Sequence, residues 1–351
     1  MKKLLGLLSL LGTAAVVIFL AAQIYDFTVH SMKKEGGTFI IDVSPNRSFY
    51  SLVPLFKEQG IPLSPLLLRL YLSLHANPKL RVGEYEIQRK WPLKKALDRI
   101  LSGEELMHKL TVKEGHNVYD ISLSLQTDGY FQKVRSSPEA FLKIMRDPKL
   151  MERMEIPKSA GSDPTGHGQP RSLEGYLFPE TYSYSKYYEP RKLVVAMLDE
   201  FTLRALPLLN SHPEWGQTPE GRYRLLTLAS IVEKESGQAA EQPIIASVFW
   251  NRIHKGMRLQ SDPTTIYALL PDFDGNLKRM HLTTPSFYNT YTLPGLPAGP
   301  ISNPGETAIR AVLNPTPSKY FYFVGRGDGT HIFAEDYRTH NENVRKFQLG
   351  Q

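Results

Sequence analysis

The sequence contains no cysteine among its 351 residues. Disulfides, thiolate metal sites, iron–sulfur clusters and cysteine nucleophiles are therefore excluded, while the cellular compartment stays open. The sequence also lacks the P-loop, dinucleotide-binding, G-x-S-x-G and H-E-x-x-H motifs. ATPase, dinucleotide-dependent and common hydrolase functions lose their main support. The 10 histidines are scattered and show no spacing suited to a zinc site, so neither a metal nor a cofactor is expected.

Long apolar runs are scarce, and only one approaches the length that spans a membrane. Residues 4–25 carry no charge, and their most apolar part, residues 4–22, would form roughly 28 Å of helix, close to the ~30 Å hydrocarbon core. A buried core helix and a signal peptide cleaved near Ala21 and Ala22 are the alternatives. We expect residues 1–25 to form a cytoplasmic flank and an uncleaved transmembrane anchor, with the rest of the chain outside the cytoplasm.

The remaining composition is that of an ordinary folded protein. Hydrophobic residues make up 41% of the chain and charged residues 22%, and the length suits two or three domains. Lys and Arg number 42 against 35 Asp and Glu, which gives a formal net charge of +7. This balance favours an acidic partner such as anionic lipid, an acidic polymer or nucleic acid, and charge alone does not choose among them.

The first half of the chain predicts small α/β modules. Residues 38–43 and 83–87 have the alternation of strands, and residues 92–101 predict an amphipathic helix that starts with proline. Residues 43–60 resemble residues 112–129 at a constant offset, and each copy predicts a strand end, a polar turn, a helix and a glycine near the helix end. Chance likeness between two ordinary units is the alternative to a true repeat.

The second half predicts a mixed α and β body. Residues 157–171 collect Gly, Ser, Pro, Asp and Gln, which is typical of an exposed loop or linker. Three helices and a hairpin with a glycine-rich turn follow it, at residues 220–235, 243–255 and 304–313 for the helices and 320–324 and 331–333 for the strands. We therefore assign the chain to the α+β class.

The most informative window is residues 225–236, where an apolar helix acquires two carboxylates as it ends. On a helical wheel, Glu233 and Glu235 flank the apolar stripe on opposite sides, and Lys234 points to solvent. Either glutamate is placed to border a groove. A solvated charge cluster at a helix end is the competing interpretation, and periodicity alone favours it.

Other polar residues form a set of candidates for substrate binding. Carboxylates, amides and aromatic rings together suit a sugar polymer, because rings stack on pyranose faces and carboxylic acids perform acid–base catalysis. Tyr and Phe are also ordinary core residues, so the signal is weak by itself. The candidates are Glu174, Glu180, Gln260, Asp262, Asn289 and Tyr291. Asp262 has an alternative role as the N-cap of a helix that begins with Pro263.

Several long motifs of the second half resemble one family. Residues 174–182, 229–235, 246–253, 256–267, 288–291, 295–305 and 320–324 are similar, in order, to motifs of the MltG (YceG-like) family of endolytic murein transglycosylases. The first half is similar in layout only. The resemblance implies a single-pass anchor in the cell inner membrane, a LysM-like module at residues 36–110 and a periplasmic catalytic domain at residues 111–351, with a flexible loop near residues 157–171.

The resemblance also implies the reaction. Family members cleave the bond between N-acetylmuramic acid and N-acetylglucosamine inside a nascent strand without adding water, and leave a 1,6-anhydromuramyl end. The family's catalytic acid corresponds to Glu235. One glutamate suffices because the C6 hydroxyl of the same sugar is the nucleophile. We expect the pKa of Glu235 to lie well above the usual ~4.3.

Partners and competing functions follow from the same resemblance. Murein strands are the expected substrate, peptidoglycan synthases are possible partners, and no base-reading motif points to nucleic acid. A muramidase that pairs Glu235 with Asp262 or Glu233 is the first alternative. A non-catalytic murein-binding scaffold is the second.

Overall fold

The computed structural model describes residues 2–32, 36–133, 136–158 and 171–349. Its contacts divide the chain into two compact units. Unit 1 comprises Met1–His108 and Ser183–Tyr187, and unit 2 comprises Lys109–Tyr182 and Tyr188–Gln351. Of the predicted exposed loop at 157–171, residues 159–170 lie outside the described residues.

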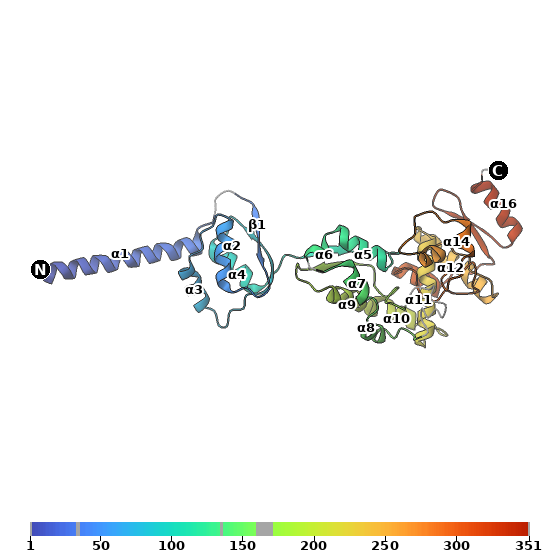
Figure 1. The fold of residues 1–351 in the computed structure, drawn as a ribbon, viewed down its shortest axis with the longest axis horizontal. Coiled ribbons are helices and arrows are strands. Elements are labelled where there is room, and N and C mark those ends of the chain that lie inside the picture. Colours follow the sequence, from blue (N-terminus) through green and yellow to red (C-terminus); the bar gives the residue numbers. More distant parts are fainter. Residues whose placement is uncertain (1, 33–35, 134–135, 159–170, 350–351) are drawn as a thin grey trace. The chain divides into compact units, whose positions relative to one another are not determined.

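The N-terminal apolar run forms one unbroken helix, α1 (Lys2–Val29), as Figure 1 shows. Within the described residues, Gly12–Val29 is the only helical stretch long and apolar enough to cross a membrane. The side chains in the middle of α1 are not packed against the protein, and Ile18 is 69% exposed. A buried core helix is therefore wrong for this run, and the helix continues beyond the predicted apolar segment.

Unit 1 is built on a two-stranded antiparallel sheet. Strand β1 (Thr38–Val43) pairs with β2 (Gly83–Gln88), with Thr38 opposite Gln88. Alternation along β1 turns Phe39, Ile41 and Val43 into the core, as the period of a strand requires. The helices around the sheet are η1 (Phe49–Ser51), α2 (Leu52–Glu58), α3 (Pro65–Ser73) and α4 (Leu93–Ser102). The strands predicted at residues 38–43 and 83–87 and the helix predicted at residues 92–101 are confirmed.

The two similar segments have the predicted layout. In the first, β1 leads through a 3₁₀ turn into α2, and in the second β3 (His108–Thr111) leads into α5 (Val118–Thr127). Glycines with left-handed φ follow both helices, 72° at Gly60 and 68° at Gly129, where a side chain would be strained. Strand β3 pairs with β4 (Thr181–Tyr184).

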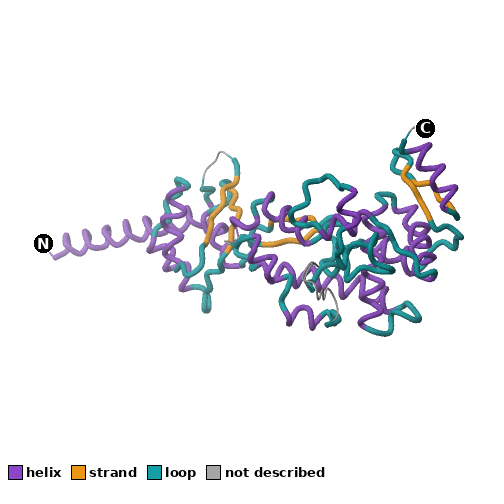
Figure 2. The backbone as a smooth tube through the Cα atoms, turned by 45° about the vertical axis from the view of Figure 1, so that its right-hand side comes forward, coloured by secondary structure: helices purple, strands orange, loops and turns teal. Residues whose placement is uncertain are grey.

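Unit 2 is mainly helical (Figure 2), with a β-hairpin near the C-terminus. In that hairpin β5 (Tyr322–Gly325) pairs antiparallel with β6 (His331–Ala334), close to the predicted strands. Its further helices, besides α5, are α6 (Tyr130–Lys133), α7 (Pro138–Ile144), α8 (Pro148–Arg153), α9 (Pro190–Glu200), η2 (Phe201–Ala205), α10 (Leu206–Asn210), α11 (Pro219–Glu235), η3 (Ala239–Glu241), α12 (Gln242–His254), α13 (Asp262–Ala268), α14 (Arg279–Thr283), α15 (Glu306–Leu313) and α16 (Tyr337–Phe347).

Helix α11 is the central element of unit 2. Thr218 caps it by accepting a hydrogen bond from the Gly221 amide, with proline at the first helical position. Every residue from Leu225 to Val232 is buried, including Thr227 and Ser230. The buried surface of the helix is therefore wider than the single apolar stripe predicted from the sequence. Helices α12 and α15 pack on α11, and the Ser230 hydroxyl accepts a hydrogen bond from the Ile301 amide at 3.0 Å on the side expected to be polar.

Candidate active site

Glu235 is the last residue of α11, and it lies in a cavity of about 450 Å³. The buried body of the helix fixes the position of this residue, while the chain leaves the helix at Ser236 in an extended conformation. The cavity has walls from α12, the loop before α13, the β5–β6 hairpin and α16. Its lining residues are Glu235, Arg252, Leu259, Gln260, Asp262, Tyr291, Tyr322, Phe323, Val324, Gly325, His331, Tyr337, His340, Val344 and Gln348.

The pKa of the Glu235 carboxyl group lies near neutrality. Burial raises the pKa of Glu235 to about 7. The negative charge of Asp262 adds to this rise in pKa, whereas a hydrogen bond from Ser261 and the nearby His331 and Arg252 oppose it. The raised pKa expected from the sequence is thus present, and its main cause is desolvation of the carboxylate.

Ser261 contacts Glu235 directly, and sequence reasoning missed it. Its hydroxyl donates a 2.5 Å hydrogen bond to Oε1 of Glu235. Its own backbone is held by two buried threonines, because its amide donates to Oγ1 of Thr290 and its carbonyl accepts from Oγ1 of Thr264. The two threonine hydroxyls also bond to each other at 2.8 Å. This network holds the serine hydroxyl rigidly against the carboxyl group.

Three of the candidates predicted for sugar binding line the same cavity. The hydroxyl of Tyr291 donates to Oδ1 of Asp262 at 2.6 Å, and Gln260 is exposed beside them. Asp262 is the first residue of α13 and Ser261 is its N-cap, without a side-chain capping bond. The alternative role of Asp262 as an N-cap is therefore wrong.

The opposite wall comes from the end of the chain. Arg252 is buried in α12 and donates to the carbonyls of Leu259 and Phe321, both at 2.6 Å, which ties the loop before α13 to the hairpin. His331 on β6 is clamped by Glu241, which accepts from its amide at 3.1 Å and pairs with its Nδ1 at 2.7 Å. The hairpin is predictable from its sequence. Its place against the end of α11 depends on these long-range contacts, which no local pattern signals.

Glu174 does not reach the cavity. It is buried in unit 2, where Oε2 accepts from the Val118 amide and the Tyr267 hydroxyl, each at 3.0 Å. Its Oε1 accepts from Nδ2 of Asn303 at 2.9 Å. Burial raises the pKa of Glu174 to about 8. These contacts join the start of α5, helix α13 and the loop before α15.

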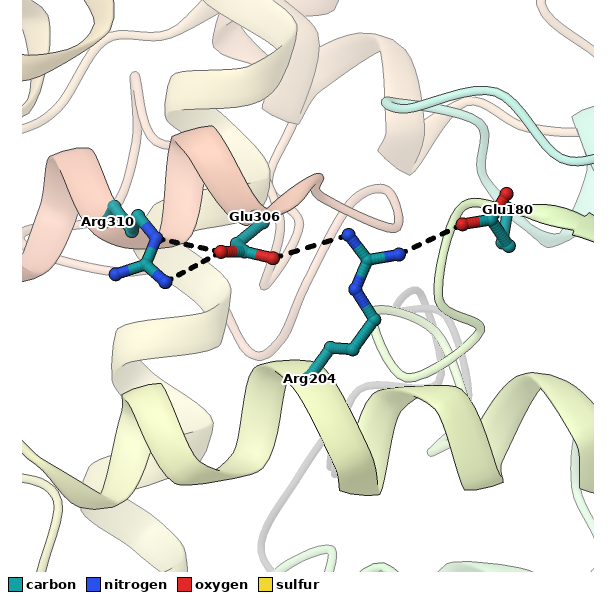
Figure 3. A network of polar contacts seen from close by, with 4 residues as sticks. All are labelled: Glu180, Arg204, Glu306 and Arg310. Atoms are coloured by element: carbon teal, nitrogen blue, oxygen red, sulfur yellow. Dashed lines mark hydrogen bonds and ion pairs between the residues drawn. The ribbon is translucent and has the colours of Figure 1, made fainter.

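Glu180 and Asn289 also lie apart from the cavity lining. Glu180 is exposed and belongs to the ion-pair network of Figure 3, in which Arg204 bridges it to Glu306 and Arg310 completes the chain. Asn289 is 1% exposed. Its amide group donates to three backbone carbonyls, the shortest at 2.7 Å to Thr284, so its hydrogen-bonding capacity is used within the protein.

Glu233, the other carboxylate of the helix end, faces a different region. Its Oε2 accepts a hydrogen bond from the Gly305 amide at 2.9 Å, and it is not among the residues that line the cavity. Burial raises its pKa as well.

Within the residues that the structure describes, no three His, Asp or Glu side chains come together as ligands for a metal ion. The arrangement supports proton transfer by one half-buried carboxyl group, flanked by aromatic and polar walls.

Comparisons with known proteins show what this chain is similar to. A sequence model of the YceG-like family matches residues 41–346. An endolytic murein transglycosylase of Bacillus subtilis is 26% identical over 328 residues, covering 90% of this chain and 87% of that protein. One of Streptococcus pneumoniae is 28% identical over 316 residues, covering 82% of this chain and 54% of that protein. A crystal structure of a YceG-like protein from Listeria monocytogenes matches with a TM-score of 0.59 and 25% identity, covering 88% of this chain and 100% of that one.

Proposed function

The chain belongs to the YceG-like family, and from this premise we propose that it is an endolytic murein transglycosylase. Its substrate is the glycan strand of peptidoglycan, and it cleaves the bond between N-acetylmuramic acid and N-acetylglucosamine inside the strand. The product carries a 1,6-anhydromuramyl end, and the reaction terminates strand elongation. The observation that carries the proposal is the half-buried carboxyl group of Glu235 in the cavity, with a pKa raised to about 7.

Glu235 performs both proton transfers. The protonated carboxyl group donates its proton to the glycosidic oxygen as the bond to the sugar breaks. The resulting carboxylate then takes the proton of the C6 hydroxyl while that oxygen attacks C1, so that the proton count balances. A group with a pKa near neutrality performs both steps at similar cost. The Ser261 hydrogen bond keeps Oε1 in a fixed orientation throughout.

A muramidase remains the second candidate, because Asp262 lines the same cavity as Glu235. A hydrolase needs a second carboxylate to activate water or to attack the sugar. Asp262 is engaged by the Tyr291 hydroxyl at 2.6 Å, and Glu233 faces Gly305. These contacts favour the transglycosylase, in which the sugar supplies its own nucleophile. A murein-binding scaffold has no use for a carboxyl group with a raised pKa in a cavity.

We propose further that α1 anchors the chain in the cell inner membrane as a single span, with both units in the periplasm. The exposed apolar side chains of α1 support the span. The first module, residues 36–110, is proposed to bind murein as a LysM-like module, and its β1–β2 sheet lies at the hydrophobic core of compact unit 1. Binding to a peptidoglycan synthase is a proposal that co-purification from solubilised membranes tests.

Mass spectrometry of purified glycan strands tests the reaction. Wild-type protein should produce anhydro ends, which are lighter by one water than hydrolysed ends. Glu235→Gln should slow cleavage by about 10² to 10⁴, the usual contribution of a positioned acid. Glu233→Gln is the matched control, because it makes the same change two residues away outside the cavity and should keep most of the activity.

The other results of this experiment would each contradict the transglycosylase proposal in a different way. Reducing ends from the wild type would make the protein a hydrolase. Equal cleavage by wild type and Glu235→Gln would remove Glu235 from the reaction. No cleavage by either protein, on strands that a control enzyme degrades, would favour the scaffold.

A further inference from the structure

Unit 1 contains a second cavity, far in sequence from Glu235, that the proposed reaction does not use. Its volume is about 600 Å³. Thr28, near the C-terminal end of α1, forms one side, and Trp91 and the basic face of α4 form the other. The residues that carry the argument are Thr28, Trp91, Lys94, Lys95 and Arg99.

The cavity is fixed in position relative to α1. Phe27 is 8% exposed and belongs to the hydrophobic core of unit 1, where its ring packs edge-on against Tyr71 at 5.8 Å between ring centroids. Three residues beyond α1, the Met32 amide donates to the Trp91 carbonyl at 3.0 Å. The end of α1 and the start of α4 therefore form one packed body.

Its depth relative to a bilayer follows from the proposed anchor, on which this inference rests. Because Phe27 packs in the core of unit 1, the membrane span ends before this residue, although the apolar stretch of α1 continues to Val29. If residues 4–22 occupy the hydrocarbon core, Thr28 lies about 9 Å beyond the core along the helix, at 1.5 Å per residue. The polar headgroup region extends roughly 5–8 Å beyond the core on each side. Thr28 therefore lies just outside the lipid headgroups, and the tilt that transmembrane helices usually adopt brings the cavity closer to them. Tryptophan and lysine are the side chains that proteins place at this level.

The charge at this level suits an anion. The cavity is lined by three basic side chains, Lys94, Lys95 and Arg99, and by two acidic ones, Asp98 and Glu104. Asp98 pairs with Lys94 at 2.8 Å and accepts the Tyr71 hydroxyl, while Glu104 pairs with Arg99, so both acidic charges are compensated within the protein. Lys95 forms no ion pair with any residue that the structure describes. Its ammonium group lies over the Trp91 ring, 4.9 Å from the ring centroid. Because Lys95 is exposed and a cation–π contact does not neutralise its charge, that charge stays available to a ligand.

We propose that this cavity binds the phosphate group of a membrane phospholipid, with Lys95 as the main contact and Trp91 at the interface beside it. A phospholipid in the leaflet that surrounds α1 presents its phosphate close to this depth, at high local concentration. Binding holds unit 1 against the bilayer surface. A single apolar helix fixes the depth of the chain but leaves unit 1 free to tilt, so a headgroup contact supplies a second constraint.

Native mass spectrometry of the full chain, released from nanodiscs of mixed phosphatidylcholine and phosphatidylglycerol, tests the proposal. The wild type should retain phosphatidylglycerol above its share of the disc. Lys95→Gln should lower this enrichment about fivefold, the change expected from one cationic contact with an anionic surface. Lys95→Arg keeps the charge and should keep the enrichment. Lys57→Gln, on the exposed end of α2, is the matched control and should leave it unchanged.

The outcomes separate this inference from the anchor. Incorporation into discs with equal enrichment for wild type and Lys95→Gln would overturn the lipid site and leave the anchor intact. Failure to enter discs would overturn the anchor and this proposal together, and neither result bears on cleavage of glycan strands. Loss of the bound lipid on adding inorganic phosphate alone would show a site for soluble phosphate and would also overturn the proposal.

Discussion

The Ser261 hydroxyl donates a 2.5 Å hydrogen bond to Oε1 of Glu235, and this bond opposes the burial that raises the pKa of the same carboxyl group. Burial disfavours the carboxylate because its charge loses contact with water, whereas a hydrogen-bond donor stabilises the carboxylate. The pKa of about 7 is the balance between the two effects. Removing one partner should therefore shift the pH dependence of the reaction in a direction fixed by the structure.

Ser261→Ala should raise the pKa of Glu235 above its present value of about 7, since the variant removes the group that lowers it. The alkaline limb of the pH–rate profile reports the loss of the catalytic proton and should move to higher pH. The folded protein should lose about 1 kcal/mol of stability, typical of one lost hydrogen bond. Ser261→Thr keeps a hydroxyl and is the control. An unchanged alkaline limb in Ser261→Ala would show that this bond does not tune the catalytic acid.

Glu235→Gln should cleave more slowly than the wild type yet be more stable at neutral pH. The unfolded chain loses the Glu235 proton near pH 4.5 and the folded chain near pH 7, so stability falls as pH rises between these values. The free energy of unfolding falls by at most about 3 kcal/mol over this range. The actual decrease is smaller, because the carboxyl group is partly exposed in the cavity. Glutamine carries no such charge and still accepts the Ser261 hydrogen bond.

Thermal unfolding of the full chain in detergent measures this difference. The variant should unfold several degrees higher than the wild type at pH 8, at roughly 2–4 °C per kcal/mol for a unit of this size. The difference should vanish near pH 4. A gap that stays constant across this range would mean that the carboxyl group is not the cause.

Asp262→Asn distinguishes the transglycosylase from the muramidase. The charge of Asp262 raises the pKa of Glu235, so the neutral variant should move the alkaline limb of the pH–rate profile to lower pH. Asparagine still accepts the Tyr291 hydroxyl, and cleavage into anhydro ends should continue within about tenfold of the wild-type rate. If Asp262 instead activates water, the variant should lose about 10² or more of its rate. Product mass and initial rate, measured together, decide between the two.

Local sequence patterns predict most elements that carry the site. The helix that ends at Glu235 is confirmed, as are the helix and the hairpin that follow it. These elements have strong local signals, namely apolar periodicity, proline at the start and a glycine-rich turn. The family resemblance is also confirmed by the match to residues 41–346.

The second wall of the cavity could not be predicted, because it depends on contacts between distant residues. Glu241 pairs with His331, which lies 90 residues later in the sequence, and Arg252 donates to the carbonyl of Phe321, 69 residues later. The helical wheel also placed Glu233 and Glu235 symmetrically. What separates them is the loop at Gly305, which occupies Glu233 and leaves Glu235 to the cavity.

Glu174 should behave as a structural residue, although its motif predicts substrate binding. It accepts hydrogen bonds from Val118, Tyr267 and Asn303 in the interior of unit 2. Glu174→Ala leaves these donors without a partner and should cost about 3 kcal/mol or more. Glu174→Gln should cost less than alanine, because its remaining oxygen still accepts from Val118 and Tyr267, although its NH2 group then faces the Nδ2 donor of Asn303. Thermal unfolding should therefore show a large loss for alanine and a smaller one for glutamine, with KM for glycan strands unchanged in the glutamine variant. A raised KM at unchanged stability would instead place Glu174 against the sugar.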